Sequence, residues 1–224
     1  MVRTLKVPED KVHVIYEAPA PHFEPLPPSA SAAMRAVRER YRLPGPFVLY
    51  VGTIEPRKNL NRLFEAFRIV RRSGFQTHNL VLVGNRGWSD ASVLASIERL
   101  GLTGVVRVLG YAPTADLVAL YNLAEVVAFP SLYEGFGLPV VEAMACGTPV
   151  VTSPNGSLAE IAGGAAELVD PRHIESIAAG LVRVVADPER RAELRAAGLA
   201  RAARFSWHSA AAQTRQVYEA VVRG

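Results

Sequence analysis

Short apolar runs alternate with amphipathic stretches along most of this 224-residue sequence, and no other feature restricts its possible folds so strongly. The runs FVLYVG and LVLVG have the length and composition of strands buried on both faces. Between residues 47 and 186 the pattern repeats in units of about 23 residues, which is typical of alternating strands and helices. We therefore predict an α/β fold with a doubly wound parallel sheet of six strands and helices on both faces.

The boundaries of these elements follow from the apolar spacing and from Gly and Pro breaks. The expected strands are Phe47–Gly52, Leu80–Gly84, Val105–Leu109, Val126–Phe129, Pro149–Thr152 and Glu167–Val169. The expected helices are Leu60–Arg72, Ser92–Leu100, Thr114–Leu123, Pro139–Cys146, Leu158–Ile161, Ile174–Val185, Pro188–Arg204 and Ser209–Val222. In the common strand order 3-2-1-4-5-6, strands one and four are neighbours where the sheet reverses direction.

The first 46 residues differ from the rest. Residues 11–16 (KVHVIY) predict one strand, and the prolines of APAPHFEPLPPSA predict an extended linker after it. A lone strand needs neighbours, either elsewhere in this domain or on a domain that this sequence lacks, and we favour the second.

Composition excludes several classes of protein. Half of the residues are apolar and 21% are charged, so the chain is expected to fold. A single cysteine, Cys146, in an apolar segment fits core packing and a reducing compartment, and we predict a cytoplasmic protein. The five histidines lack metal-ligand spacing, so no metal is expected. The net charge of +4 does not predict nucleic acid binding, because no aromatic residues accompany the basic ones.

The densest basic cluster is expected on the wet face of a helix, where a membrane-surface role would be possible but has no support from the sequence. It comprises Arg190, Arg191, Arg195, Arg201 and Arg204.

The first candidate site follows the first strand. Gly52 and Thr53 lead into Arg57 and Lys58, which precede a helix. Loops at the carboxyl ends of parallel strands form the ligand crevice, and helix N-termini there bind anions. Arg57 and Lys58 are therefore candidate phosphate ligands, although both can equally be charges on a loop.

The second candidate site follows the fourth strand. Glu134, Gly135, Phe136, Gly137 and Leu138 lead into a helix that carries Glu142. Phosphate is expected on the amides of Gly137 and Leu138, with the two carboxylates accepting hydrogen bonds from sugar hydroxyls on either side. Alternatively, Glu142 complements the helix dipole and Glu134 is a loop charge. Neither GxGxxG after the first strand nor GxxxxGK[ST] is present, which argues against a dinucleotide oxidoreductase and a P-loop NTPase.

Two segments together carry a family resemblance. GTIEPRKN, followed about 75 residues later by PSLYEGFGLPVVEAMACGTPVVTS, resembles the donor-binding domain of retaining glycosyltransferases of family four, which have the GT-B architecture of two Rossmann-like domains. Glu134 and Glu142, eight positions apart, match the paired glutamates of that family. The resemblance covers the chain from about residue 11 to its end.

The resemblance implies a domain organisation. Residues 1–46 would be a remnant of a missing acceptor domain, residues 47–206 the nucleotide-sugar donor domain and residues 207–224 a C-terminal helix. It also implies hexosyl transfer from a nucleoside diphosphate sugar to a hydroxyl of a glycan or lipid-linked acceptor, which the missing domain would hold. The chain alone would then be inactive in transfer.

The resemblance also implies roles for the site residues. Arg57 and Lys58 would hold the diphosphate, Glu142 the ribose, and Glu134 with the amides of residues 135–138 the sugar and phosphate. Thr53 departs from members with an arginine there, and Arg57 would replace that group. No cofactor is implied, and the EPRKN loop, which resembles mannosyltransferases, makes GDP-mannose the first donor to test. A non-catalytic nucleotide-sugar binding module and a GT-B epimerase or phosphorylase are the alternatives.

Overall fold

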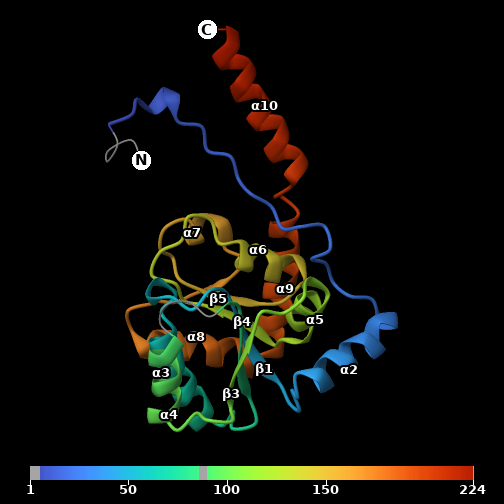
Figure 1. The fold of residues 1–224 in the computed structure, drawn as a ribbon, viewed down its shortest axis with the longest axis vertical. Helices are drawn as coiled ribbons and strands as arrows, with labels where there is room; N and C mark the ends of the chain where they lie inside the picture. Colours follow the sequence, from blue (N-terminus) through green and yellow to red (C-terminus); the bar gives the residue numbers. More distant parts are fainter. Residues whose placement is uncertain (1–5, 86–89, 224) are drawn as a thin grey trace.

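The computed structural model describes residues 6–85 and 90–223 and forms an α/β domain around a parallel six-stranded sheet (Figure 1). The strand order is β3-β2-β1-β4-β5-β6, which confirms the predicted fold and its reversal between β1 and β4. The strands are β1 (Phe47–Val51), β2 (Asn79–Val83), β3 (Val106–Gly110), β4 (Val126–Phe129), β5 (Val150–Thr152) and β6 (Glu167–Leu168).

The interior strands are apolar throughout because helices cover both faces of the sheet. Every residue of β1, β2, β4 and β5 is buried, whereas most of the edge strand β3 is only partly so. β1 pairs in parallel with both β2 and β4, so the carboxyl ends of β1 and β4 lie side by side. This adjacency brings the two predicted site loops together.

The helices fall into two groups around the sheet. α3 packs on α8 against one face, while α6 packs on α9 and against β4 and β5. The helices are α2 (Ser31–Arg40), α3 (Leu60–Arg72), α4 (Asp90–Arg99), α5 (Thr114–Leu123), α6 (Leu138–Ala145), α7 (Leu158–Ala162), α8 (Ile174–Ala186), α9 (Pro188–Ala202) and α10 (Trp207–Arg223), with 3-10 turns η1 (Glu9–Lys11), η2 (Pro28–Ala30) and η3 (Pro56–Lys58). Among the described residues no helix combines the length and the apolar character needed to cross a bilayer.

The start of the chain differs from the prediction. Residues 11–16 form no strand: the 3-10 turn η1 ends at Lys11 and an extended segment without strand pairing follows. The β-branched residues of this run have no neighbouring strand to pair with in the described part of the chain. The prediction of a strand was therefore wrong, because an alternating pattern cannot supply its own partner.

The proline-rich segment packs onto the sheet domain and leads into a helix that the sequence reasoning missed. Phe23 meets the ring of Tyr121 edge-on, with centroids 5.7 Å apart. α2 follows a Pro-Pro pair and is tied to α5 by Asp116, which accepts hydrogen bonds from Arg40 at 2.6 Å and from Tyr41 at 2.7 Å. α2 buries only Val37, so its apolar periodicity is too weak to identify it from the sequence.

The arginines of α9 were predicted to form a solvated face, and for three of them this was wrong. Arg191 donates to the carbonyls of residues 184 and 185 at the end of α8, Arg195 donates to Gly147 after α6, and Arg201 donates to Ile161 at the end of α7. The last carbonyls of a helix have no partner within it, and an arginine from a neighbouring helix can satisfy them. These side chains therefore hold three helices together.

The two ends of the chain project together from the domain. The extended N-terminal segment and α10 both leave the body on the same side (Figure 1). Val12 and Ile15 share a pocket with Val217, so the segment runs alongside the helix. We call residues 6–18 and α10 the projecting pair.

Two glycines allow β1 and β2 to end in close contact. Gly84 has a φ of +147°, and a Cβ atom there would lie 2.2 Å from the carbonyl oxygen of Gly52. Gly74 also has a positive φ, +106°, but a Cβ atom there would meet nothing within 4 Å.

Alanine substitutions at Gly74 and Gly84 separate the cost of backbone strain from the cost of a steric clash. We expect Gly74→Ala to lower the free energy of unfolding by about 1 to 2 kcal/mol through strain alone. Gly84→Ala adds a backbone clash and should cost at least about 2 kcal/mol more. Urea denaturation of both variants measures the difference, and equal losses would show that the two chain segments separate without cost.

Candidate functional site

The loops that follow β1 and β4 meet at the reversal point of the sheet, as predicted. The amide of Leu132 donates to the carbonyl of Arg57 at 2.8 Å, which joins the two loops through the backbone. Arg57 and Lys58 lie in the 3-10 turn η3 just before α3. The β4–α6 loop, residues 130–137, carries Glu134 to the same place.

Glu134 binds both cations of the first loop. One carboxylate oxygen is 2.7 Å from Lys58 Nζ and the other is 2.6 Å from an Arg57 guanidinium nitrogen. The side chains of Lys58 and Glu134 are each 8% exposed, whereas that of Arg57 is 45% exposed. Arg57 also pairs with Glu55 at 2.6 Å. The three side chains therefore form one ion-pair network across the two loops.

The environment favours the ionised forms of Glu134 and Arg57, with the pKa of the carboxyl lowered and that of the guanidinium raised. Burial disfavours the charged form of Glu134, but hydrogen bonds from Lys58 and Arg57 outweigh it and hold the pKa of its carboxyl below the ordinary range. Lys58 Nζ also lies 4.8 Å from the centre of the Phe129 ring, a cation–π contact. The site therefore holds two cations that share one anion.

Asn59 fixes this arrangement in a way that the sequence reasoning did not predict. It has a left-handed backbone, with φ of +64°, and is buried. Its side-chain amide donates to the carbonyls of Pro130 at 3.0 Å and Pro171 at 2.6 Å. Asparagine tolerates this backbone conformation and carries the two donors, which is the signal that could have identified it.

The β4–α6 loop is held from the side of α7. Ser157 Oγ donates to the carbonyls of Glu134 at 3.1 Å and Phe136 at 2.8 Å. Gly137 has φ of +108°, and a Cβ atom there would lie 2.7 Å from the side chain of Leu158. α6 begins at the next residue, and amides in the first turn of a helix have no intrahelical acceptor. Gly135, Phe136, Gly137 and Leu138 thus join the loop that carries Glu134 to the N-terminus of α6.

Glu142 lies one turn into α6 and has a different partner. The hydroxyl of Tyr121 donates to its carboxylate at 2.9 Å, and burial raises the pKa of Glu142 above its ordinary value despite this bond. Tyr121 is completely buried, and its own pKa is raised by burial. Glu142 is therefore a half-buried carboxylate that is held by the Tyr121 hydroxyl.

The remaining predicted residues lie around this centre. Gly52 ends β1, and the carbonyl of the exposed Thr53 accepts a hydrogen bond from the Tyr50 hydroxyl at 3.2 Å. Tyr111 comes just after β3 and is 71% exposed. Cys146 is fully buried and burial raises its pKa to about 12, which confirms its role in packing.

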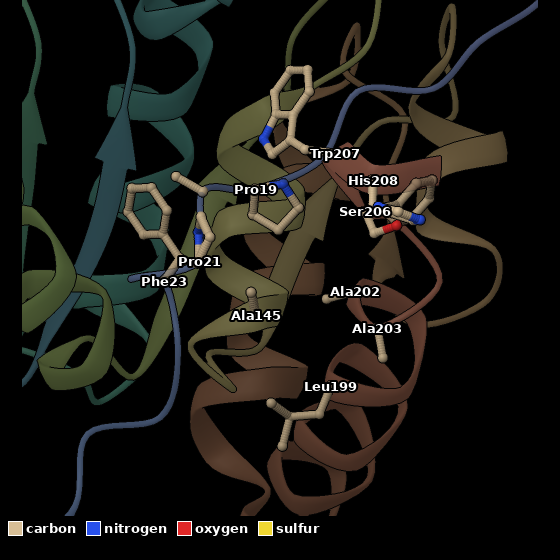
Figure 2. A pocket seen from close by; sticks show the side chains of 12 residues that line it. Pro19, Pro21, Phe23, Ala145, Leu199, Ala202, Ala203, Ser206, Trp207 and His208 are labelled. Carbon is tan, nitrogen blue, oxygen red and sulfur yellow. The ribbon is translucent and has the colours of Figure 1, made fainter. Parts of the chain in front are cut away.

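The largest pocket described here lies away from these residues. It has a volume of about 470 Å³ and is lined mainly by apolar side chains of the proline-rich segment, of α9 and of the start of α10, including Phe23, Leu199 and Trp207 (Figure 2). None of the predicted site residues lines it. The site at the sheet reversal is defined by its charged side chains.

The shared carboxylate predicts a pH-dependent contribution to stability. Because the pKa of Glu134 is lower in the folded protein than its reference value of 4.5, ionised Glu134 stabilises the fold above that value and loses this effect as pH falls through the folded pKa. Glu134→Gln should lower the free energy of unfolding at pH 7 by about 3 kcal/mol, because it leaves buried Lys58 without its counter-ion. Denaturation at pH 7 and near pH 3 tests this: the loss should shrink in acid, and an unchanged loss would contradict it.

Comparisons with known proteins agree with this geometry. The chain is 37% identical over 220 residues to the O-antigen chain mannosyltransferase B of Escherichia coli, and the match covers 98% of this chain and 57% of that protein. It is also 37% identical over 183 residues to a D-inositol 3-phosphate glycosyltransferase of Segniliparus rotundus, covering 79% of this chain and 40% of that protein. The chain thus matches 57% of the length of the first relative and 40% of the length of the second.

Solved structures share the fold. A sucrose-phosphate synthase from Thermosynechococcus elongatus superimposes with a TM-score of 0.79 at 28% identity, over 93% of this chain and 52% of that chain. Anabaena Alr3699/HepE, solved in complex with UDP-glucose, superimposes with a TM-score of 0.79 at 24% identity, over 95% of this chain and 57% of that chain. Residues 36–201 match the family described as Glycosyl transferases group 1. The chain belongs to this glycosyltransferase family.

Proposed function

We propose that this chain is the nucleotide-sugar-binding half of a retaining hexosyltransferase. The observation that carries the proposal is the junction of Arg57, Lys58 and Glu134 beside the N-terminus of α6. A diphosphate needs cations and free amides, and a sugar needs hydrogen-bond acceptors, and this junction offers both. The name of the E. coli relative supports a sugar transfer reaction.

The two cations act on the leaving group. As the bond from the sugar to the diphosphate breaks, negative charge grows on the diphosphate oxygens, and Arg57, Lys58 and the amides of Gly137 and Leu138 stabilise it. Lys58 is already buried and oriented over Phe129, so little rearrangement is needed. This mechanism uses side-chain cations where other enzymes use a metal ion.

Glu134 changes partners when the donor binds. In the structure its carboxylate neutralises Arg57 and Lys58. A bound diphosphate competes for both cations, and the released carboxylate can accept hydrogen bonds from hydroxyls of the sugar. Glu134 therefore favours a diphosphate that carries a sugar over one that does not.

Glu142 binds the ribose. Tyr121 occupies one carboxylate oxygen, which leaves the other to accept a hydrogen bond from a ribose hydroxyl. Tyr111, exposed at the end of β3 on the same edge of the sheet, is available to the base. These positions give the nucleotide a course from the end of β3 across to the loop after β4.

We propose the donor and the acceptor from the similarity of this chain to named relatives and solved structures. GDP-mannose is the first donor to test because the E. coli relative is named a mannosyltransferase, and the UDP-glucose complex of HepE makes UDP-glucose the second. The acceptor, a glycan or a lipid-linked glycan, would be held by a second domain that corresponds to the rest of the relatives' length. We expect the protein to act in the cytoplasm.

The diphosphate site can be tested by charge reversal. Lys58→Glu should weaken GDP binding at least about 100-fold, because it places an anion beside the phosphates. The matched control is Arg215→Glu on α10, where the arginine side chain is 77% exposed and pairs only along its own helix with Glu219. Arg195 is unsuitable as a control because it caps the end of α6 at Gly147. Isothermal titration calorimetry measures both affinities, and equal losses would show that the site is misplaced.

The two glutamates can be separated by the choice of ligand. Glu134→Ala should abolish the tighter binding of GDP-mannose relative to GDP, because the carboxylate accepts hydrogen bonds from the sugar. The affinity for GDP itself should not fall, because the carboxylate competes with the phosphates for the two cations. Glu142→Ala should lower the affinity for GDP and for GDP-mannose by about tenfold each, because both ligands lose the hydrogen bond from the ribose. The reverse pattern in calorimetry would exchange the two assignments.

A further inference from the structure

Three aromatic rings from distant parts of the sequence meet beside the candidate site. Tyr16 belongs to the extended N-terminal segment, Phe136 to the β4–α6 loop and Phe205 to the connection between α9 and α10. The ring centres of Tyr16 and Phe136 are 6.3 Å apart, and Phe205 lies 5.8 Å from each of them. We call these three rings the aromatic cluster.

Two rings of the cluster are anchored independently of the third. The Tyr16 hydroxyl donates to the Glu160 carboxylate on α7. The Arg201 guanidinium lies 4.9 Å from the centre of the Phe205 ring and donates to the carbonyls of Glu160 at 2.5 Å and Ile161 at 2.9 Å. Contacts with α7 therefore hold Tyr16 and Phe205 in position, and the ring of Phe136 packs against both of them.

Phe136 connects these two rings to the ligand groups. It lies between Glu134 and the first residue of α6, Leu138, so its position affects the direction of the carboxylate and of the helix-end amides. Ser157 holds the carbonyl of Phe136 from one side. The ring contacts hold its side chain from the other side, so the loop is clamped at both backbone and side chain.

One of the other two rings lies in the projecting pair and the other lies next to it. Tyr16 belongs to the N-terminal segment, and Phe205 comes two residues before α10. The projecting pair exposes apolar side chains, with Val14 67%, Tyr218 68% and Val222 86% accessible. The aromatic cluster therefore links both projecting segments to the β4–α6 loop.

We propose that Tyr16 and Phe205 are positioning residues that set the β4–α6 loop through Phe136, and so make donor binding depend on the two projecting segments. The ligand part of this inference rests on the proposed function, whereas the effect on the loop does not.

The test compares variants inside and outside the cluster in the 224-residue chain. Phe205→Leu and Tyr16→Leu remove one ring each, and Tyr218→Leu on α10 is the matched control outside the cluster. Hydrogen exchange without ligand should become faster in residues 134–138 in both cluster variants, with the control unchanged. GDP affinity by calorimetry should fall roughly threefold to tenfold in the same two variants, the size expected for a lost aromatic pair.

Two further measurements separate a positioning role from a loss of fold. Tyr16 is 37% exposed, so Tyr16→Leu disturbs packing less than the substitution of buried Phe205. Tyr16→Phe keeps the ring but loses the hydrogen bond to Glu160, so its exchange and affinity should lie between those of Tyr16→Leu and wild type. The proposal is overturned if exchange at residues 134–138 does not change, or if it changes equally in Tyr218→Leu. Wild-type chain that binds no GDP would instead contradict the proposed function, while the exchange result would still decide the effect on the loop.

Discussion

The carboxylate of Glu134, shared between Arg57 and Lys58, is the interaction on which the site depends. It joins the loop after β1 to the loop after β4, and it does so only because the sheet places those two strands side by side. Lys58 and Glu134 are almost completely buried, so either charge without the other would be costly. The pair therefore links the stability of the fold to the chemistry of the crevice.

In the unliganded site the charges of Arg57 and Lys58 are balanced by Glu134 and Glu55. Asn59 holds the loop of the two cations to the carbonyls of Pro130 and Pro171, so under the proposed function a diphosphate would meet cations that are already in position. The loop that carries Glu134 is held by Ser157 and by the aromatic cluster. Such preorganisation lowers the cost of binding and directs the available charge at the bond that breaks.

Much of this could be predicted from the sequence because the signals are local. The helix Leu60–Arg72 and the strand Val126–Phe129 have the predicted bounds, since strong apolar periodicity marks the first and a buried run between breaks marks the second. The meeting of Lys58 and Glu134 followed from the strand order that such units adopt. Features that depend on tertiary partners could not be predicted: residues 11–16 lack a strand to pair with, α2 buries a single residue, and the arginines of α9 find helix ends that only the fold brings near.

The most direct test of this account is a crystal structure of the chain with GDP-mannose bound. The account predicts that the diphosphate lies within hydrogen-bond distance of Arg57, Lys58 and the amides of Gly137 and Leu138, with Glu134 turned from the cations to hydroxyls of the sugar. A donor bound elsewhere, such as in the pocket between Phe23 and Trp207, or a diphosphate bound while Glu134 keeps both cations, would contradict it.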